Sequence, residues 1–429
     1  MVNVLCHTIT PPGSRTLRIL HLAHQYLPEH VGGVELYTRW LSQAQSRRGH
    51  QVAVFHRCSA DGMGRETRAE GAVRIWSAWA GAAPPPRRFL NTFRDPPMVS
   101  LWEQTLVEFA PDLVHIEHLM GLPTALIRAI QRRRIPYVIT LWDFWWVCAN
   151  AQLLTNYDQQ ICKGPRAYLN CARCALARAG RSGLWSAAPP LAGLMAWRNR
   201  LLRQVMVDAG ALIAPTEFVH RWYAAHRTPQ ERLVTLLPGM EQPNLPPRSS
   251  RTDGLLRFAY IGGLSGQKGV HVLVEAFGGV RGDAELWIAG DESFDPDYVA
   301  RLRELATPNV RFLGRLSREA VWETLAQADV VAVPTLWYET FSFIISEAFI
   351  AGLPVVASRL GPLADRVRDG VDGLLLPPGD VTAWQAALQR LIDEPHLVVR
   401  WRDNVQPPMT IEEHALHIES LYARLIRNS

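Results

Sequence analysis

Lysine is almost absent from this sequence. Lys163 and Lys268 are the only two lysines among 45 basic residues, so nearly every cation in the chain is an arginine. Forty acidic residues leave a net charge of +5, with no basic run longer than Arg132-Arg133-Arg134. We therefore expect no nucleic-acid partner, because such binding needs a concentrated basic surface. The small excess instead suits an anionic ligand or an anionic membrane surface.

Long apolar runs and a secretory leader are also missing. No stretch approaches the ~18–20 uninterrupted apolar residues of a membrane span, and residues 1–16 lack the charged-then-apolar pattern of a signal peptide. Six cysteines in 429 residues do not form the dense disulfide framework of a small secreted protein. These absences predict a cytoplasmic protein with reduced thiols, whose contact with a membrane would be peripheral and on its inner face.

Short apolar strands alternate with amphipathic helices along most of the chain. Leu17 to Leu22 predicts a buried first strand, and residues 34–44 repeat apolar side chains with a helical period. The alternation restarts at Phe258 to Ile261 and continues to a helix that Asp380 is placed to cap. This α/β pattern is typical of parallel sheets covered by helices on both faces.

A proline-rich stretch interrupts the alternation and predicts a domain boundary. The expected units are a leader at 1–16, a Rossmann-like domain at 17–245, a linker at 246–254, a second Rossmann-like domain at 255–406 and a final helix at 407–429. Two doubly wound domains of this kind face each other across a cleft, and such folds bind ligands at the carboxyl ends of their strands.

Two glutamates, Glu339 and Glu347, lie in a loop and in the helix that follows it in the second domain. The amides of Phe341, Ser342 and Phe343 would lie at the N-terminus of that helix, where free N–H donors favour a phosphate. A carboxylate inside the helix can accept hydrogen bonds from a vicinal diol such as a ribose. Ordinary capping or solvation of the helix by Glu347 is the alternative explanation.

A glycine-rich loop, Gly262 to Gly269, follows the first strand of the second domain and contains one of the two lysines. Glycine lets the backbone approach a ligand closely, and the compact ammonium of Lys268 suits a diphosphate. The alternative is a surface lysine without a specific role.

With these residues in place, the chain resembles the family-four retaining glycosyltransferases (glycosyl transferases group 1), which have the GT-B fold and use nucleotide-activated sugars. The matching motifs of the second half are Lys268-Gly269, Ile288-Ala289-Gly290-Asp291, Glu339 and Glu347 with seven residues between, residues 352–358 and residues 373–380. Those of the first half are Gly32-Gly33-Val34-Glu35, residues 111–115, Thr140-Leu141-Trp142-Asp143 and residues 214–218. The resemblance covers nearly the whole chain, and its final helix would return to the first domain.

The resemblance implies a role for each matching position. Glu347 would bind the nucleotide ribose and Glu339 the donor sugar, while Lys268 would stabilise the negative charge of the departing diphosphate. The remaining implied donor-binding residues are Gly32, Gly33, Gly263, Phe341, Ser342 and Phe343, with Asp143 as a further catalytic candidate and Trp142 and His118 on the acceptor side. We expect no metal at this site and no cofactor besides the nucleoside-diphosphate sugar, which is the donor substrate.

Two positions depart from the family pattern. Gly263 stands where the family usually has an arginine that also clamps the diphosphate, and Arg359 is a candidate replacement from its position after a strand. Trp142 stands where the family has a histidine that commonly contacts the donor sugar. A tryptophan can stack on a sugar ring but cannot exchange a proton near pH 7. Asp143, His115 and His118 are close in sequence and could partly compensate, although a structural role is the favoured interpretation of each.

We therefore expect a glycosyltransferase that moves a hexose-type sugar to a saccharide, lipid-linked or small-molecule acceptor, with retention implied by the resemblance. Envelope or exopolysaccharide biosynthesis is the expected context. The two departures keep a second hypothesis open, a low-activity or non-catalytic nucleotide-sugar-binding partner of a transferase. A GT-B nucleotide-sugar epimerase is a third.

An insertion at about residues 142–200 contains Cys148, Cys162, Cys171 and Cys174 within 27 residues. Four thiolates could form a structural zinc site, but their irregular spacing favours reduced thiols without metal. The apolar stretch 184–197 of the same insertion is flanked by Arg181 and Arg198. It predicts either contact with a membrane interface or packing against the helices of its own domain.

Overall fold

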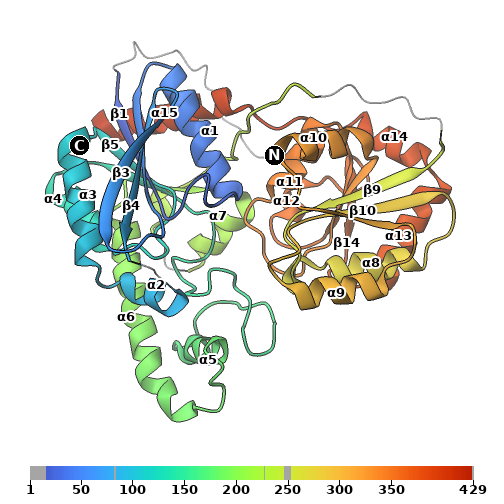
Figure 1. The fold of residues 1–429 in the computed structure, drawn as a ribbon, viewed down its shortest axis with the longest axis horizontal. Helices are drawn as coiled ribbons and strands as arrows, with labels where there is room; N and C mark the ends of the chain where they lie inside the picture. Colours follow the sequence, from blue (N-terminus) through green and yellow to red (C-terminus); the bar gives the residue numbers. More distant parts are fainter. Residues whose placement is uncertain (1–15, 82–83, 227, 246–252, 428–429) are drawn as a thin grey trace.

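The computed structural model describes residues 16–81, 84–226, 228–245 and 253–427. Two α/β domains, each built on its own sheet, lie side by side along the longest axis of the molecule (Figure 1). Nearly all of the expected leader and most of the expected linker, 246–252, fall outside the described residues.

The first sheet has the strand order β3-β4-β2-β1-β5-β6-β7-β8. Every neighbouring pair is parallel except β3 and β4, which are antiparallel. Its strands are β1 Arg18–Ala23, β2 Gln51–Arg57, β3 Met63–Glu70, β4 Val73–Ala80, β5 Leu113–Ile116, β6 Tyr137–Thr140, β7 Ala211–Ala214 and β8 Leu233–Thr235. Its central strands are buried, as their continuous apolar sequences predict.

Helices cover both faces of this sheet. They are α1 Gly33–Arg47, α2 Pro85–Asn91, α3 Pro96–Phe109, α4 Ala125–Arg132, α5 Leu169–Arg178, α6 Ala188–Val207 and α7 Glu217–Ala224. The long α6, with α5 beside it, extends away from the sheet (Figure 1). These two helices form an arm between β6 and β7, the segment expected from the sequence to be an insertion.

The second sheet has the order β11-β10-β9-β12-β13-β14 and is parallel throughout. Its strands are β9 Leu256–Ile261, β10 Ala284–Ala289, β11 Val310–Gly314, β12 Val330–Val333, β13 Val355–Ser358 and β14 Gly373–Leu376. Its helices are α8 Val270–Gly278, α9 Pro296–Leu305, α10 Arg318–Gln327, α11 Phe343–Ile350, α12 Leu363–Arg366, α13 Val381–Asp393 and α14 His396–Arg402. Asp380 caps α13 as predicted, accepting a hydrogen bond from the amide of Ala383 at 3.0 Å.

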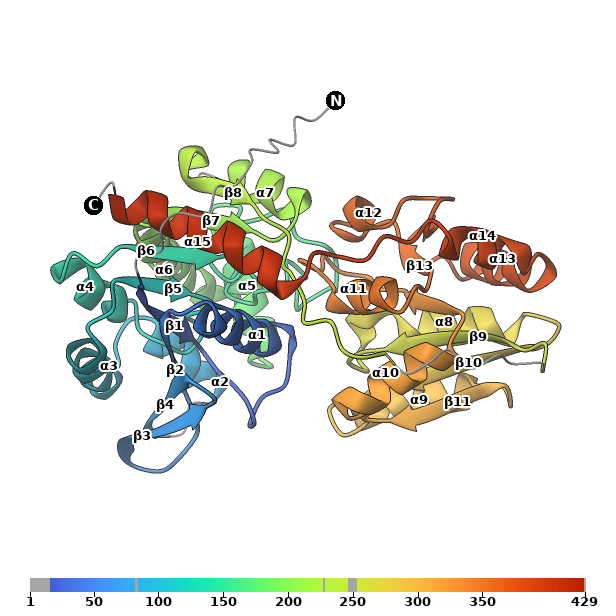
Figure 2. The same ribbon diagram turned by 90° about the horizontal axis from the view of Figure 1, so that it is seen from above.

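The final helix, α15 Ile411–Arg427, packs against α1 of the first domain (Figure 2). His414 Nε2 lies 2.7 Å from the hydroxyl of Tyr37, and Ile418 and Tyr422 are buried in the same apolar cluster as Tyr37. The chain therefore passes from the first sheet to the second and back. The two passages lie side by side, because the amide of Met240 donates to the carbonyl of Met409 at 3.1 Å.

Candidate active site

Two loops meet at the carboxyl edge of the second sheet, one after β9 and one after β12. The amide of Leu336 donates to the carbonyl of Gln267 at 2.8 Å. Gly269 has φ +70°, and a Cβ at that position would lie 2.0 Å from the carbonyl oxygen of Pro334. Only glycine tolerates both the left-handed backbone and this approach, which explains the Lys268-Gly269 pair.

Lys268 and Glu339, predicted separately, are brought together by these loops. Lys268 Nζ lies 2.6 Å from Glu339 Oε1, and the indole N–H of Trp337 donates to the same oxygen at 3.3 Å. The ammonium also lies 5.4 Å from the centre of the Trp337 ring. Both charged side chains keep some exposure, 28% and 13%, so a ligand can compete for them.

The N-terminus of α11 is held by Arg366, a residue that the sequence analysis did not single out. Its guanidinium donates to the carbonyls of Phe341 at 2.7 Å and Ser342 at 2.9 Å, and to Ser346 Oγ at 2.6 Å. Burial lowers the pKa of Arg366 to about 9. Ser342 has φ +64°, which is unusual for a residue with a side chain, and Arg366 holds the carbonyl of that strained residue.

Glu347 is buried in α11 and forms an ion pair with Arg318, at the start of α10. The guanidinium carbon of Arg318 lies 4.8 Å from the Trp322 ring and 5.6 Å from the ring of Trp40 in the first domain. The carboxylate expected to bind a ribose thus already has a cationic partner. Nothing in the spacing of Glu347 and Arg318 predicts this pairing.

The loop after β12 also contacts the first domain. Thr340 Oγ1 donates to the carbonyl of Trp142 at 2.5 Å, and Thr216 Oγ1 donates to the carbonyl of Thr340 at 3.2 Å. A Cβ on Gly33 would lie 2.5 Å from the ring of Phe343, so Gly33 lets the two domains approach at this point. The loop that contains Glu339 and the start of α11 therefore lie against the first domain at Trp142, Thr216 and Gly33.

On the first-domain side, Asp143 and His118 are paired. His118 Nε2 lies 3.0 Å from Asp143 Oδ2, while His118 Nδ1 accepts the amide of Met120 at 3.1 Å. Because Nδ1 accepts a hydrogen bond, we assign the ring hydrogen to Nε2, which donates to the carboxylate. The Asp143 side chain is 29% exposed, and the carbonyl of the preceding residue, Trp142, contacts the loop after β12.

Trp142 itself is 4% exposed and packs edge-on against Tyr37. Its indole N–H donates to Glu117 Oε2 at 2.9 Å. In this arrangement the ring belongs to the apolar core and does not present a face for stacking on a sugar. Glu117, which the sequence analysis missed, is the reason that the indole is held there.

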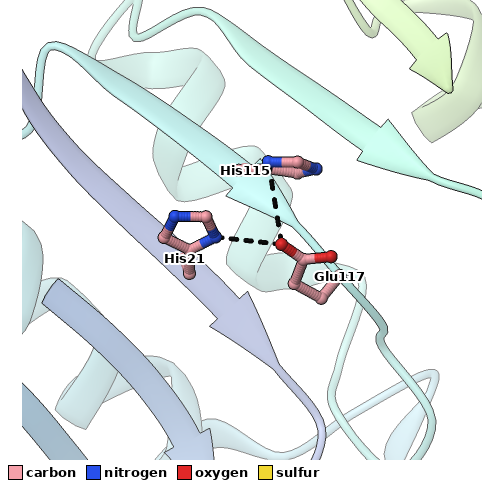
Figure 3. Close-up of side chains that lie close together, drawn as sticks. All are labelled: His21, His115 and Glu117. Atoms are coloured by element: carbon pink, nitrogen blue, oxygen red, sulfur yellow. Dashed lines mark hydrogen bonds and ion pairs between the residues drawn. The ribbon is translucent and has the colours of Figure 1, made fainter. Parts of the chain in front are cut away.

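Glu117 belongs to a buried network that joins β1 to β5 (Figure 3). Through Tyr422 the network also reaches the final helix. His21 Nδ1 lies 2.9 Å from Glu117 Oε1, and His115 Nδ1 lies 3.7 Å from the same oxygen. Within the described ranges these three side chains form the one group of ligand atoms spaced for a metal ion. Each ring nitrogen already has a protein partner: Glu117 and Gln45 for His21, and Tyr422 and Thr140 for His115. The group is therefore satisfied as a hydrogen-bond network.

A tyrosine holds the backbone at Gly263, and the expected cationic replacement, Arg359, has other partners. The hydroxyl of Tyr260 donates to the carbonyl of Gly263 at 2.7 Å, and a Cβ on Gly263 would meet no atom within 4 Å. Arg359 is bound elsewhere, to Asp369 and to the carbonyl of Leu375. A pocket of about 30 Å³ contains Lys268 and Glu339, and Lys268 is the only cation among the described residues that line it.

Two other features do not contribute to this site. A larger cavity of about 490 Å³, lined by Asp283 and Asp329 among others, lies at the amino edge of the second sheet, whereas parallel sheets bind ligands at their carboxyl edge. Asp295-Pro296-Asp297 has the Asp-x-Asp spacing of many metal-binding pairs, but Asp295 caps α9 by accepting the amide of Tyr298 at 3.2 Å.

Comparison with solved structures confirms the expected GT-B fold. Sucrose-phosphate synthase from Thermosynechococcus elongatus is similar with a TM-score of 0.73 and 19% identity, over 96% of this chain and 100% of that one. Anabaena HepE, solved in complex with UDP and glucose, gives a TM-score of 0.65 and 18% identity over 95% and 100%. The chain has the fold of a GT-B glycosyltransferase.

The family follows from the sequence matches. Residues 256–394 match the family model "Glycosyl transferases group 1", and residues 32–239 match "Glycosyl transferase 4-like domain". The chain belongs to this glycosyltransferase family. It is 25% identical to D-inositol 3-phosphate glycosyltransferase of Corynebacterium kroppenstedtii, over 92% of this chain and 86% of that protein. It is 26% identical to glycogen synthase of Mycobacterium tuberculosis, over 88% and 87%. Among its described helices, none is long and apolar enough to cross a membrane.

Proposed function

We propose that this glycosyltransferase moves a hexose-type sugar from a nucleoside diphosphate to a saccharide or lipid-linked acceptor with retention of configuration, in envelope or exopolysaccharide biosynthesis. The observation that carries the proposal is the Lys268–Glu339 pair at the carboxyl edge of the second sheet. In this scheme the second domain, 255–406, binds the donor, and the first, 17–245, binds the acceptor.

The donor would separate this ion pair. Its diphosphate replaces Glu339 as the ionic partner of Lys268. The lysine then stabilises the negative charge that builds on the leaving group as the glycosyl–oxygen bond breaks. Glu339 is then free to accept hydrogen bonds from the sugar, with Trp337 keeping it in place. Glu347 would accept the ribose hydroxyls while Arg318 holds its carboxylate.

Asp143 would act from the acceptor side. It directly follows Trp142, whose carbonyl accepts the Thr340 hydroxyl, so its carboxylate lies beside the loop that contains Glu339. We propose that it accepts a hydrogen bond from the acceptor hydroxyl, and that His118 fixes its orientation. Asp143→Asn should lower turnover at saturating donor, whereas donor affinity should stay the same.

Peripheral membrane contact is part of the proposal. Leu184 and Trp185, between α5 and α6, are 49% and 53% exposed, as is Trp197 on α6 at 51%. Arg198, which flanks this stretch, is fully buried, and its guanidinium is bound to the carbonyl of Trp145 and the side chain of Asn199. Sedimentation with anionic vesicles, compared between the native protein and Trp185→Ser, tests this contact.

The decisive experiment is a panel of nucleotide sugars, with affinity and nucleotide release measured in parallel. Release that depends on a membrane extract as acceptor source would support the transferase and name its donor. Binding without release would favour the non-catalytic partner, and conversion of the donor without acceptor would favour an epimerase. Failure of every donor to bind would contradict the proposed site.

A further inference from the structure

The arm between β6 and β7 brings its four cysteines to one place. Cys148 and Cys162 lie at the two ends of a hairpin, which an antiparallel bridge between Leu154 and Ile161 closes. Cys171 and Cys174 lie three residues apart in α5 and so project from the same side of that helix. Each of the four thiols lies close enough to interact electrostatically with each of the other three. None of them is in a disulfide.

Two of the four sulfur atoms accept hydrogen bonds from N–H groups. The amide of Asn156 donates to Cys174 Sγ at 3.2 Å, and the amide of Gly164 donates to Cys162 Sγ at 3.4 Å. The side-chain amide of Asn170 lies 3.6 Å from Cys162 Sγ as a second donor. Donors aimed at sulfur favour a thiolate, which is the form of cysteine that binds a metal. Burial raises the pKa of Cys148, Cys171 and Cys174, so these thiols keep their protons until a metal displaces them.

A buried cation, Arg198, lies beside the cluster. It is 0% exposed and interacts electrostatically with Cys148, Asp143 and Cys171. Its hydrogen bonds go to neutral groups, the carbonyl of Trp145 at 2.7 Å and the side chain of Asn199 at 3.0 Å. Its Nε has no partner among the described residues. A fully buried guanidinium requires a compensating negative charge.

The backbone of the hairpin and of the start of α5 is strained. Ala151, Leu153, Gln159, Ala167 and Tyr168 all have positive φ, a conformation that costs free energy in residues other than glycine. Ala151 and Leu153 are anchored in the main core of the first domain, whereas the buried members of the cluster between α5 and α6 are three alanines and one leucine. A cross-link between the hairpin and α5 would therefore join the weakly packed part of the arm to the well-packed part.

We propose that Cys148, Cys162, Cys171 and Cys174 bind one Zn²⁺ as a structural tetrathiolate centre. Four sulfur ligands at tetrahedral geometry select zinc and leave no open position for catalysis. Zn²⁺ replaces the thiol protons, and the resulting centre carries a charge of 2−, which Arg198 partly compensates. In the described structure no three of these sulfur atoms all lie within 4.8 Å of one another. Because Zn–S bonds are ~2.3 Å long, metal binding would draw the hairpin and α5 closer together.

The proposed centre would also fix the acceptor side of the cleft. The amide of Cys148 donates to the carbonyl of Phe144 at 2.7 Å, directly after Asp143. Arg198 holds the carbonyl of Trp145. A change in the arm is thus transmitted to the loop that contains Asp143, although zinc takes no part in the sugar transfer.

Elemental analysis of the intact protein, purified without chelator, tests the inference. We expect about one zinc per chain and four thiols that react with a thiol reagent only after a chelator is added. Exchange for Co²⁺ should give the intense visible bands of tetrahedral tetrathiolate cobalt. These measurements need no variant and do not depend on any glycosyltransferase activity.

Variants locate the site within the chain. Cys171→Ser and Cys174→Ser should each lose most of the zinc, whereas Cys58→Ser, which alters a buried thiol bonded to the carbonyl of Ala78, should retain it. Protein without zinc whose four thiols react at once would overturn the proposal. So would disulfides detected by mass, stoichiometric iron, or zinc retained in both variants.

Discussion

The loops after β9 and β12, called the donor loops below after their proposed role, contain an ion pair, and so does the buried network of the first domain. The two ion pairs differ in their surroundings. Lys268 and Glu339 form an ion pair at 2.6 Å with 28% and 13% of their side chains exposed. His21 and Glu117 pair at 2.9 Å with both side chains wholly buried. The first pair can exchange its partner for a ligand, whereas the second is enclosed by Gln45 and the indole of Trp142.

The difference teaches that burial and hydrogen-bond saturation separate a ligand site from a structural network. Charged groups in water exchange partners at small cost, but a buried charge that loses its partner costs several kcal/mol. Substitutions in the donor loops should therefore alter turnover and binding. Substitutions in the buried network should alter the free energy of unfolding.

The largest effect is expected for Lys268→Ala. Loss of the cation at the leaving group should lower turnover by ~10²–10³-fold, with a much smaller change in donor affinity and an unchanged melting temperature. Nucleotide release at saturating donor measures it. Lys163→Ala removes the only other lysine, which is exposed, and should behave as the native protein. Equal losses in turnover and in donor affinity would make Lys268 a binding residue only.

Acid should destabilise the protein through the buried histidines of the first domain and the final helix. Burial lowers the pKa of His115 to about 4 and that of His414 to about 3. The unfolded chain then binds protons that the folded chain does not, so stability is complete above pH ~6.5 and falls as the pH drops toward 4. The loss from His115 is roughly 3 kcal/mol. Denaturant unfolding at several pH values checks this, and His115→Asn should have a flatter pH profile.

Glu347→Ala should weaken donor binding by ~1–3 kcal/mol, because charge-assisted hydrogen bonds to the ribose are lost. Calorimetry with the donor identified by the panel measures the change. Glu319→Ala alters an exposed glutamate near the pairing partner Arg318 and should bind normally. Unchanged affinity in Glu347→Ala would remove this residue from the site.

The smallest effect is expected for the hydrogen bond between Trp142 and Glu117, where the buried network adjoins the loop that contacts the second domain. Trp142→Phe removes the indole N–H that donates to the Glu117 carboxylate. It should lower the free energy of unfolding by about 1 kcal/mol more than Trp146→Phe does. Trp146 is a matched control because its ring is equally buried and its Nε1 has no partner among the described residues. Equal effects in the two variants would mean that the hydrogen bond to Glu117 contributes no stability.

The second domain was largely predictable from sequence because its motifs reflect backbone constraints. Gly269 must be glycine where the chain approaches Pro334, and Asp380 caps a helix by a local hydrogen bond. Such constraints act over a few residues and leave a readable pattern. The alternation of strands and helices predicted the two doubly wound layers for the same reason.

What the sequence did not predict depends on contacts between distant residues. Arg318 and Arg366 are two of many arginines until the fold places them against Glu347 and the start of α11. Strand β3 escaped prediction because MGRETRAE is polar, and its pairing with β4 supplies the missing context. Trp142 was expected at a sugar because nothing near it in sequence indicates that Glu117 holds its indole.

The return of α15 to the first domain sets an order of folding. Ile411, Ile418 and Tyr422 complete an apolar core whose other members come from α1 and the first sheet. During synthesis that core stays open until residues 411–427 have left the ribosome, whereas the sheet of the second domain is complete at Leu376. The second domain is therefore one continuous segment of the chain that can fold as a unit, and the first domain is completed after it.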